Sequence, residues 1–270
     1  MLVILGLCLY LATYASATLA WKLSLRILGQ PTSYAKLARV LLLSQFAKYL
    51  PGNVGHHIGR VVLAKRVGLR LEPVIASMAI DIVILLAAAV ICSLPAFALT
   101  QSFIGKYGAN HGMVAVWVIM IAILVLVTLA IVPVTRRIIV HHSRFIAQHC
   151  GLKQFPLFAK AGLVHCFDFI LGATALYLLC SAFAGTFGAT WLSILGIYTA
   201  AWLLGFIMPG APAGLGVREL ALLVGLSPIY GEQQAMEAAA ILRLVTTSGD
   251  GIVFLFAYIR WGKIIPASSP

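Results

Sequence analysis

Two ten-residue stretches of this chain share an unusual arrangement of proline, glycine and arginine. "PGNVGHHIGR" fills residues 51–60 and "PGAPAGLGVR" fills residues 209–218, so each begins with Pro-Gly, contains further glycines and ends with an arginine. Proline and glycine interrupt helices, and an arginine guanidinium can bind a phosphate through two parallel hydrogen bonds. The pattern therefore predicts broken backbone beside an anion-binding arginine, at two places in one chain.

The composition indicates the medium in which these segments lie. Hydrophobic residues make up 62% of the 270 residues and charged residues only 10%, and the mean hydropathy is +1.03. These values lie far outside the range of soluble domains. We therefore expect an all-α, polytopic integral membrane helix bundle that forms a single transmembrane domain over residues 1–270.

The apolar stretches are long enough to cross about 30 Å of hydrocarbon as helices. The first is expected to be a retained helix, because it lacks the basic start and the small-residue cleavage site of a signal peptide. About seven spans are predicted, at residues 1–21, 73–97, 113–135, 157–182, 190–208 and 234–260, with a shorter one at 215–229.

The basic residues predict the orientation of the spans. Lysine and arginine gather in residues 22–72, in residues 136–156 and near the C-terminus, and such loops are normally cytoplasmic. We expect the N-terminus outside, the C-terminus inside, and both Pro-Gly segments facing the cytoplasm, in the cytoplasmic membrane of a prokaryote. The net charge of +12 fits loops beside an anionic leaflet, so no nucleic-acid partner is expected.

Residues 31–50 are too polar for a span that faces lipid, although their apolar residues follow a helical period. An interfacial or re-entrant helix that ends at Pro51 fits better. Broken backbone at membrane depth is tolerated only where protein or a water-filled cavity covers it. We therefore expect a first re-entrant segment at 31–60 and a second at 207–219, around one protected cavity.

The residues around this cavity are the candidates for binding an anionic group. The alternative is that both segments are interfacial loops whose arginines touch ordinary headgroups and whose glycines serve helix packing. The predicted substrate-binding residues are Arg60, Arg218, Arg243, Gln45 and Lys48, with the glycines Gly52, Gly210, Gly214 and Gly216.

Four of the seven acidic residues are placed to balance or gate these cations: Asp81, Asp168, Glu219 and Asp250. A carboxylate inside a bilayer is costly, so the three aspartates should be buried in protein or face the cavity. Two roles stay open. The acids either form structural pairs, for example Arg243 with Asp250 through an intermediate polar group or Arg60 with Asp81 across helices, or they release an arginine or carry a coupling proton when a headgroup arrives.

The histidines and glycines match no cofactor motif. Neither the His56–His57 pair nor the pair of His165 with Asp168 has a metal-ligand spacing, and the glycine-rich segments do not follow a strand. We expect no metal and no cofactor. His56 and His57 are expected to be solvated or headgroup-facing residues that protonate near neutrality, whereas His165 is the better functional candidate.

The sequence "MPGAPAGLGVREL" resembles the Pro-Gly-Gly-Leu-Gly-Val-Arg-Glu signature of the lysylphosphatidylglycerol synthase transmembrane, or flippase, domain family, with Ala213 where that family usually has glycine. "KYLPGNVGHHIGR" resembles the family's earlier Pro-Gly and Arg segment. The resemblance covers about residues 20–262, and the N-terminus is shorter than the family leads us to expect, by one helix.

The resemblance implies a polytopic lipid transporter that moves an anionic phospholipid or a polyprenyl-phosphate-linked lipid between leaflets, with Arg218 as the foremost headgroup ligand. No soluble aminoacyltransferase domain follows, so the chain is not expected to make lysylphosphatidylglycerol, and no catalytic motif points to an enzyme. Two alternatives stay open: a membrane-embedded transferase acting on a polyprenyl-phosphate lipid, and a non-transporting partner that presents lipid to a glycosyltransferase or synthase.

Overall fold

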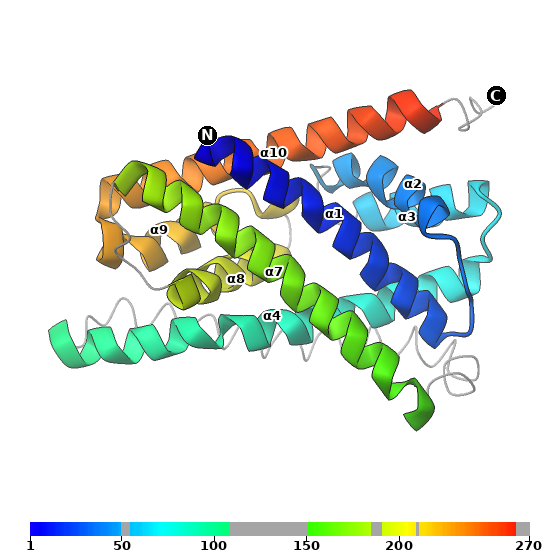
Figure 1. Cartoon of the computed structure of the whole chain (residues 1–270), viewed down its shortest axis with the longest axis horizontal. Helices are drawn as coiled ribbons and strands as arrows, with labels where there is room; N and C mark the ends of the chain where they lie inside the picture. Colours follow the sequence, from blue (N-terminus) through cyan, green and yellow to red (C-terminus); the bar gives the residue numbers. More distant parts are fainter. Residues whose placement is uncertain (50–54, 108–150, 185–190, 209–210, 263–270) are drawn as a thin grey trace.

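Every regular element that the structure describes is a helix (Figure 1). The computed structural model describes residues 1–49, 55–107, 151–184, 191–208 and 211–262. Backbone groups inside lipid must be paired within their own segment, which a helix achieves and an open strand does not. The predicted polytopic helix bundle is thus confirmed. Its long helices are α1 (Leu2–Ile27), α4 (Leu71–Tyr107), α7 (Phe155–Ala184) and α10 (Glu232–Trp261), and its shorter elements are α2 (Tyr34–Ser44), η1 (Gln45–Tyr49), α3 (Gly55–Arg66), η2 (Leu152–Gln154), α8 (Trp191–Ile207), η3 (Pro212–Gly214) and α9 (Val217–Tyr230).

The predicted spans coincide with helices wherever the structure describes them. In that part of the chain, five helical segments are long and apolar enough to cross a membrane: α1, the first part of α4, α7, η3 with α9, and α10. The stretch expected at 190–208 is the shorter apolar helix α8. The stretch expected at 113–135 lies outside the described residues.

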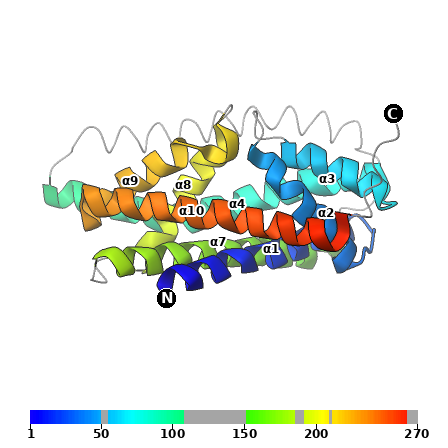
Figure 2. The same ribbon diagram turned by 90° about the horizontal axis from the view of Figure 1, so that it is seen from above.

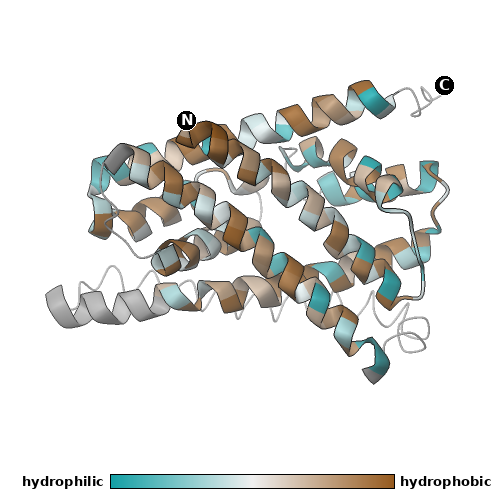
Figure 3. Cartoon of the chain, viewed as in Figure 1, coloured by the Kyte–Doolittle hydropathy of each residue, from teal (hydrophilic) through white to brown (hydrophobic). Residues whose placement is uncertain are grey.

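Helices α4 and α10 run close to the long axis of the molecule, whereas α1 and α7 cross it obliquely, side by side (Figure 1; Figure 2 shows the bundle from above). The C-terminal ends of α1 and α10 and the N-terminal ends of α4 and α7 lie at the same end. That end carries Arg26, Lys153 and Arg260, and it is visibly hydrophilic (Figure 3). The basic loops therefore share one side of the bundle, as expected, and its identity as the cytoplasmic side stays a prediction.

The two Pro-Gly segments belong to different helical pairs. Helices α2 and α3 pack on each other at the basic end of the bundle, while α9 extends toward the opposite end. Helices α8 and α9 form an antiparallel hairpin, because Gly205 approaches Arg218 near its tip whereas Gly225 approaches Ile197 farther away. That both segments face the cytoplasm stays a prediction. Helix α8 is only about 26 Å long, so the second segment follows a helix too short for a full crossing.

Small side chains allow the helices of the bundle to approach closely, as expected where lipid gives no hydrophobic driving force between helices. A Cβ on Gly196 of α8 would lie 2.3 Å from the backbone nitrogen of Ala96 in α4. Helix α1 packs extensively along α7 and buries Ser16, Thr18 and Ser24. These close contacts hold rigid walls around the polar interior described next.

Candidate functional site: a charged cavity inside the bundle

A cavity of about 250 Å³ lies inside the bundle, near the middle of α1 and α7. Both Pro-Gly segments line it, the first with His56, His57 and Arg60 and the second with Ala213 and Arg218. The described residues of both segments therefore face the interior of the bundle. The polar and charged lining comprises Tyr10, Thr13, Tyr14, Gln45, Lys48, Tyr49, His56, His57, Arg60, Asp81, His165, Asp168, Tyr198, Arg218, Arg243, Thr246 and Asp250.

The two arginines that close the Pro-Gly segments both line the cavity without a carboxylate partner. All seven acidic residues of the chain lie in its described part, and none forms an ion pair with Arg60 or Arg218. Arg60 is only 9% exposed. Its Nε, and the Nε and Nη2 of Arg218, are buried with no hydrogen-bond partner among the described residues. Buried donors are normally paired, so these nitrogens are suited to a guest anion.

Aromatic rings support these two guanidinium groups. Arg60 lies 5.6 Å from the ring centroid of Trp21, and Arg218 lies 5.1 Å from that of Tyr198. Such contacts stabilise a cation without occupying its hydrogen-bond donors. A Cβ on Gly172 would lie 2.2 Å from the Tyr198 hydroxyl, so glycine at that position makes room for the ring.

Arg218 is the second residue of α9, where free backbone amides and the helix dipole also favour an anion. One of the backbone amides at this helix start already has an acceptor, because the Gly216 N–H donates to Glu219 Oε2 at 2.7 Å. Gly216 and Gly214 have φ values of +82° and +71°, a region that favours glycine. A Cβ on Gly214 would also lie 2.8 Å from Gly205 Cα. These two predicted glycines therefore shape the tip, whereas Gly52 and Gly210 lie outside the described residues.

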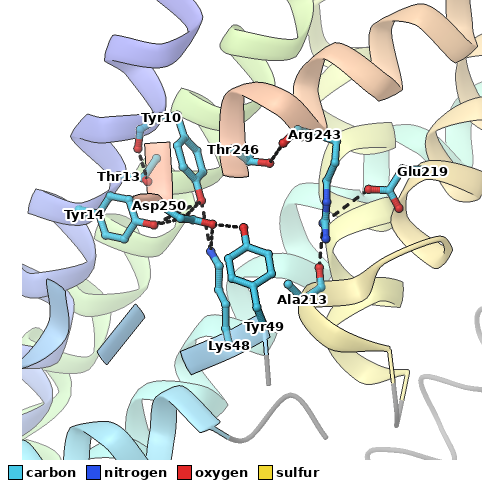
Figure 4. A network of polar contacts seen from close by, with 10 residues as sticks. All are labelled: Tyr10, Thr13, Tyr14, Lys48, Tyr49, Ala213, Glu219, Arg243, Thr246 and Asp250. Carbon is cyan, nitrogen blue, oxygen red and sulfur yellow. Dashed lines mark hydrogen bonds and ion pairs between the residues drawn. The ribbon is translucent and has the colours of Figure 1, made fainter. Parts of the chain in front are cut away.

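Arg243 joins α10 to this tip (Figure 4). Its Nη1 donates to the backbone oxygen of Ala213 at 3.1 Å and lies 3.5 Å from Glu219 Oε1. Its Nη2 is buried and has no hydrogen-bond partner in the described part of the chain. Arg243 thus connects α10 to the second segment through Nη1, and its Nη2 is left to bind an anion in the cavity.

Asp250 forms the other charged centre of the cavity (Figure 4). It is fully buried, and its Oδ2 lies 2.7 Å from Lys48 Nζ. Tyr10 donates to it at 2.7 Å, and Tyr14 and Tyr49 donate to it as well. Burial lowers the pKa of Lys48, and the charge of Asp250 opposes that shift. Lys48 is therefore a neutralised cation, unlike Arg60 and Arg218.

Neither predicted pair forms a direct ion pair. The carboxylate beside Arg243 is Glu219 rather than Asp250, and Asp250 holds Lys48. Asp81 and Arg60 interact electrostatically but form no ion pair. Asp250 lies two helical turns beyond Arg243, and Tyr49 lies between them: its hydroxyl donates to Asp250, and its ring centroid is 6.0 Å from the Arg243 guanidinium, which the spacing alone does not reveal.

Asp81 and Asp168 lie on another wall of the cavity, on either side of His165. Nε2 of His165 is 3.1 Å from Asp81 Oδ1, and its Nδ1 is 3.7 Å from Asp168 Oδ2. Ser24 donates to Asp81 at 3.1 Å, and Ser16 donates to Asp168. The prediction that Asp81, Asp168 and Asp250 are buried or face the cavity is confirmed.

The expectation that His56 and His57 protonate near neutrality was wrong. Both line the cavity, and burial is the main cause that lowers the pKa of His56 to about 2 and that of His57 to about 4, with the charge of Arg60 contributing in each case. They are therefore neutral at physiological pH instead of titrating near neutrality. Two adjacent polar residues do not indicate which side of a helix faces the cavity, so the position of these histidines on α3 could not be predicted from the sequence.

Sequence reasoning missed the tyrosines around Asp250. Tyr10 and Tyr14 are one helical turn apart in an otherwise apolar span, and a hydroxyl in that position needs an acceptor. That spacing was the available signal for a polar centre. An aromatic wall of Phe169, Trp202 and Phe206 was missed too, because aromatic residues are common throughout membrane helices.

In the described part of the chain, no group of three or more histidine, cysteine or acidic side chains is arranged to hold a metal ion. Among the charged residues of the cavity, Arg60 and Arg218 carry the two guanidinium groups that no carboxylate of the chain pairs. No curated protein and no solved structure matched the chain. The model of the family described as "Lysylphosphatidylglycerol synthase TM region" matches residues 1–253, which extends the resemblance to the first residue, and this multi-pass membrane protein belongs to that family.

Proposed function

We propose that the protein is a lipid transporter, or flippase, that moves a lipid with an anionic phosphate headgroup between the two leaflets. The observation that carries this proposal is the pair of unpaired guanidinium groups of Arg60 and Arg218 in one cavity inside the bundle. The membrane is the cytoplasmic membrane of a prokaryote. The function requires no covalent step, so the chain acts as a carrier rather than an enzyme.

The charges of the cavity support an anionic guest. Lys48 is neutralised by Asp250, Arg243 lies beside Glu219, and both Asp81 and Asp168 contact His165. Even with one negative charge left on the group of Asp81, Asp168 and His165, the cations Arg60 and Arg218 give the lining a net positive charge. A headgroup phosphate loses its water in the membrane interior, and two arginine forks replace that water with charge-assisted hydrogen bonds.

The size of the cavity supports a headgroup rather than a whole lipid. Its volume of about 250 Å³ is below the range of pockets that enclose drug-sized ligands, roughly 300–1,000 Å³. The acyl or polyprenyl chains would stay in the hydrocarbon while the phosphate crosses between Arg60 and Arg218. A phospholipid and a polyprenyl-phosphate-linked lipid present the same phosphate chemistry.

Leaflet-resolved transport in proteoliposomes tests the proposal. Wild-type protein should move a labelled anionic phospholipid or a labelled polyprenyl-phosphate lipid, and Arg218→Ala should abolish the movement at equal amounts of folded protein. Arg70→Ala is the matched control, because Arg70 is exposed near the start of α4 and does not line the cavity. Native mass spectrometry of the gently purified protein would identify the bound lipid and decide between the two classes.

Three results would contradict the proposal. Wild-type transport by Arg218→Ala would remove this arginine from the headgroup site. Conversion of the lipid by purified protein, given a donor and an acceptor, would favour the transferase. Specific lipid binding without any movement between leaflets would favour a protein that presents lipid to a glycosyltransferase or synthase.

A further inference from the structure

Headgroup binding at Arg60 and Arg218 leaves one polar cluster of the cavity without a role. Asp81 on α4 and the pair His165 and Asp168 on α7 are held within hydrogen-bond or ion-pair distance of one another. His165 is 3% exposed and Asp81 7%. Three titratable groups buried side by side in a membrane bundle mark a pathway for ions or protons.

The charges of this cluster do not balance by themselves. With the imidazole protonated on both nitrogens, the two carboxylates and the histidine carry one net negative charge, and one more proton on a carboxylate makes the cluster neutral. Ser24 and Ser16 on α1 each donate a hydrogen bond to one of the carboxylates, so both acids keep a partner in the charged state. Groups that interact so closely still bind protons in steps, but each step belongs to the cluster rather than to one residue.

Arg60 is the cation that compensates the cluster. Burial lowers the pKa of Arg60, and Asp81 is the largest charge that opposes this shift. Among the other groups facing the cluster, His57 on α3 is neutral, because burial and Arg60 lower its pKa to about 4. On α1, the Tyr14 hydroxyl is engaged with Asp250 of α10, whose charge is in turn held by Lys48. Arg60 therefore faces two possible negative partners, Asp81 and an incoming headgroup.

We propose that Asp81, His165 and Asp168 form a proton-binding site that is coupled through Arg60 to headgroup binding. The coupling rests on the proposed transport function. When a phosphate binds Arg60, its charge no longer compensates Asp81, and the cluster takes up a proton from solvent. By linkage, a lower pH must then tighten headgroup binding, by up to about tenfold per pH unit when one proton is taken up per lipid.

Calorimetry on the purified wild-type protein measures this uptake directly. The probe is dioctanoyl phosphatidylglycerol, a phosphodiester whose own charge is constant over the range used. Binding is measured in two buffers of different ionisation enthalpy, and we expect uptake that approaches about one proton per lipid. Asp168→Asn should bind the lipid with markedly less uptake, whereas Glu72→Gln, which changes an exposed acid at the start of α4, should keep wild-type uptake.

A second measurement needs neither lipid nor transport. The infrared band of protonated carboxyl groups is followed against pH in wild-type protein, Asp168→Asn and Arg60→Gln. Arg60→Gln should move the titration to higher pH, because removal of a nearby positive charge makes the cluster easier to protonate. Asp168→Asn should lose part of the titrating band, and Glu72→Gln should leave the shift caused by Arg60→Gln unchanged.

The two measurements distinguish failure of this inference from failure of the proposed function. An infrared titration that responds to Arg60→Gln in a protein that binds no anionic lipid would keep the proton site and overturn lipid transport. Lipid binding without proton uptake, or a titration that Arg60→Gln does not move, would overturn the inference and leave the transport proposal standing. Because the wild-type measurements need no variant, a poorly folding Asp168→Asn does not block the test.

Discussion

The two Pro-Gly segments share one sequence pattern, but α10 holds them by different chemistry. Asp250 holds the first through Lys48 and Tyr49, which lie just before Pro51, whereas Arg243 holds the second through the backbone oxygen of Ala213. Both attachments include an ion pair, but that of the first has a fully buried carboxylate, whereas Glu219 beside Arg243 is partly exposed. Only the second adds close glycine packing, since a Cβ on Gly214 would reach Gly205 Cα.

This difference separates what each segment contributes. A segment held by a buried ion pair responds to changes in charge, while a segment held by backbone packing keeps its arginine in a constant position. The first segment also carries Arg60, which faces both the headgroup site and Asp81. We therefore interpret the first segment as the part of the cavity that senses charge and the second as the fixed binding platform.

The largest expected effect comes from Asp250→Asn, which leaves Lys48 buried without its anion. Breaking a buried pair in this way destabilises a protein by about 3–5 kcal/mol. The sign of the pH dependence follows from Lys48, whose pKa burial lowers below its unfolded value. Between those two values the unfolded state binds more protons, so stability rises with pH.

The melting temperature of the purified protein between pH 7 and pH 10 measures this effect. The deficit of Asp250→Asn relative to wild type should shrink as the pH rises and Lys48 loses its proton. Arg243→Gln, which loosens the second segment instead, serves as the control and should show a deficit that varies less with pH, because arginine keeps its charge. A constant deficit for Asp250→Asn would contradict an ionic attachment of the first segment.

Gly214→Ala should damage the second segment almost as strongly. The left-handed backbone at φ +71° costs a non-glycine residue about 1–2 kcal/mol, and the added Cβ lies 2.8 Å from Gly205 Cα. With about 1–2 kcal/mol more for overpacking, we expect a loss of roughly 2–4 kcal/mol in the free energy of unfolding.

Gly59→Ala is the matched change in the first segment. Its Cβ would lie 3.2 Å from the Cβ of Ser44, and the helical backbone there accepts alanine. A gain of about 1 kcal/mol in helix propensity offsets the tighter contact, so the change should be nearly neutral. Equal losses for the two variants would show that glycine packing does not distinguish the segments.

Arg218→Ala should weaken binding of an anionic lipid by about 10- to 150-fold, which corresponds to the 1.5–3 kcal/mol of a charge-assisted hydrogen bond. Folded yield should stay near wild type, because no carboxylate of the protein loses a partner. Arg218→Lys should retain part of the affinity, since the charge survives and the bidentate geometry does not.

A double-mutant cycle with Arg60→Ala tests whether the two segments bind one headgroup. If both arginines contact the same phosphate, the double variant should lose less affinity than the sum of the single losses. Fully additive losses would indicate two independent anions, one at each segment. A misfolded Arg218→Ala protein would instead point to a structural role for this arginine.

Hydropathy predicted the helices well because lipid imposes one strict requirement, an internally paired backbone of about 20 apolar residues per span. The repeated Pro-Gly pattern likewise predicted that Arg60 and Arg218 come together. Both features can be recognised within a short stretch of sequence, because each is set by the residue types of that stretch.

The partners of the charged residues could not be predicted in the same way. Whether Asp250 meets Arg243 or Lys48 depends on how α10 is rotated against η1, and no single-segment pattern contains that angle. The position of the second segment beside the cavity depended on the short length of α8, which ends at Ile207. The inward side of α3, which buries His56 and His57, depended on its packing against the rest of the bundle.

A small stabilising effect is expected of Ala213→Gly, at the one non-glycine residue with positive φ in the described part of the chain. Ala213 has φ +51° and ψ +29°, a left-handed conformation that costs alanine about 1–2 kcal/mol, and the family that the chain resembles usually has glycine there. Glycine removes this strain but adds about 0.4–1 kcal/mol of conformational entropy to the unfolded chain. The net result should be a stabilisation of less than about 1 kcal/mol, seen as a small rise in melting temperature, with Arg243 still bonded to the backbone oxygen of residue 213.

Because the first segment is held through side chains on α10, the variant should leave the pH dependence of Asp250→Asn unchanged when the two substitutions are combined. A fall in melting temperature would show that the methyl group of Ala213 packs usefully in the tip, and that the strained backbone is not what limits the stability of the second segment.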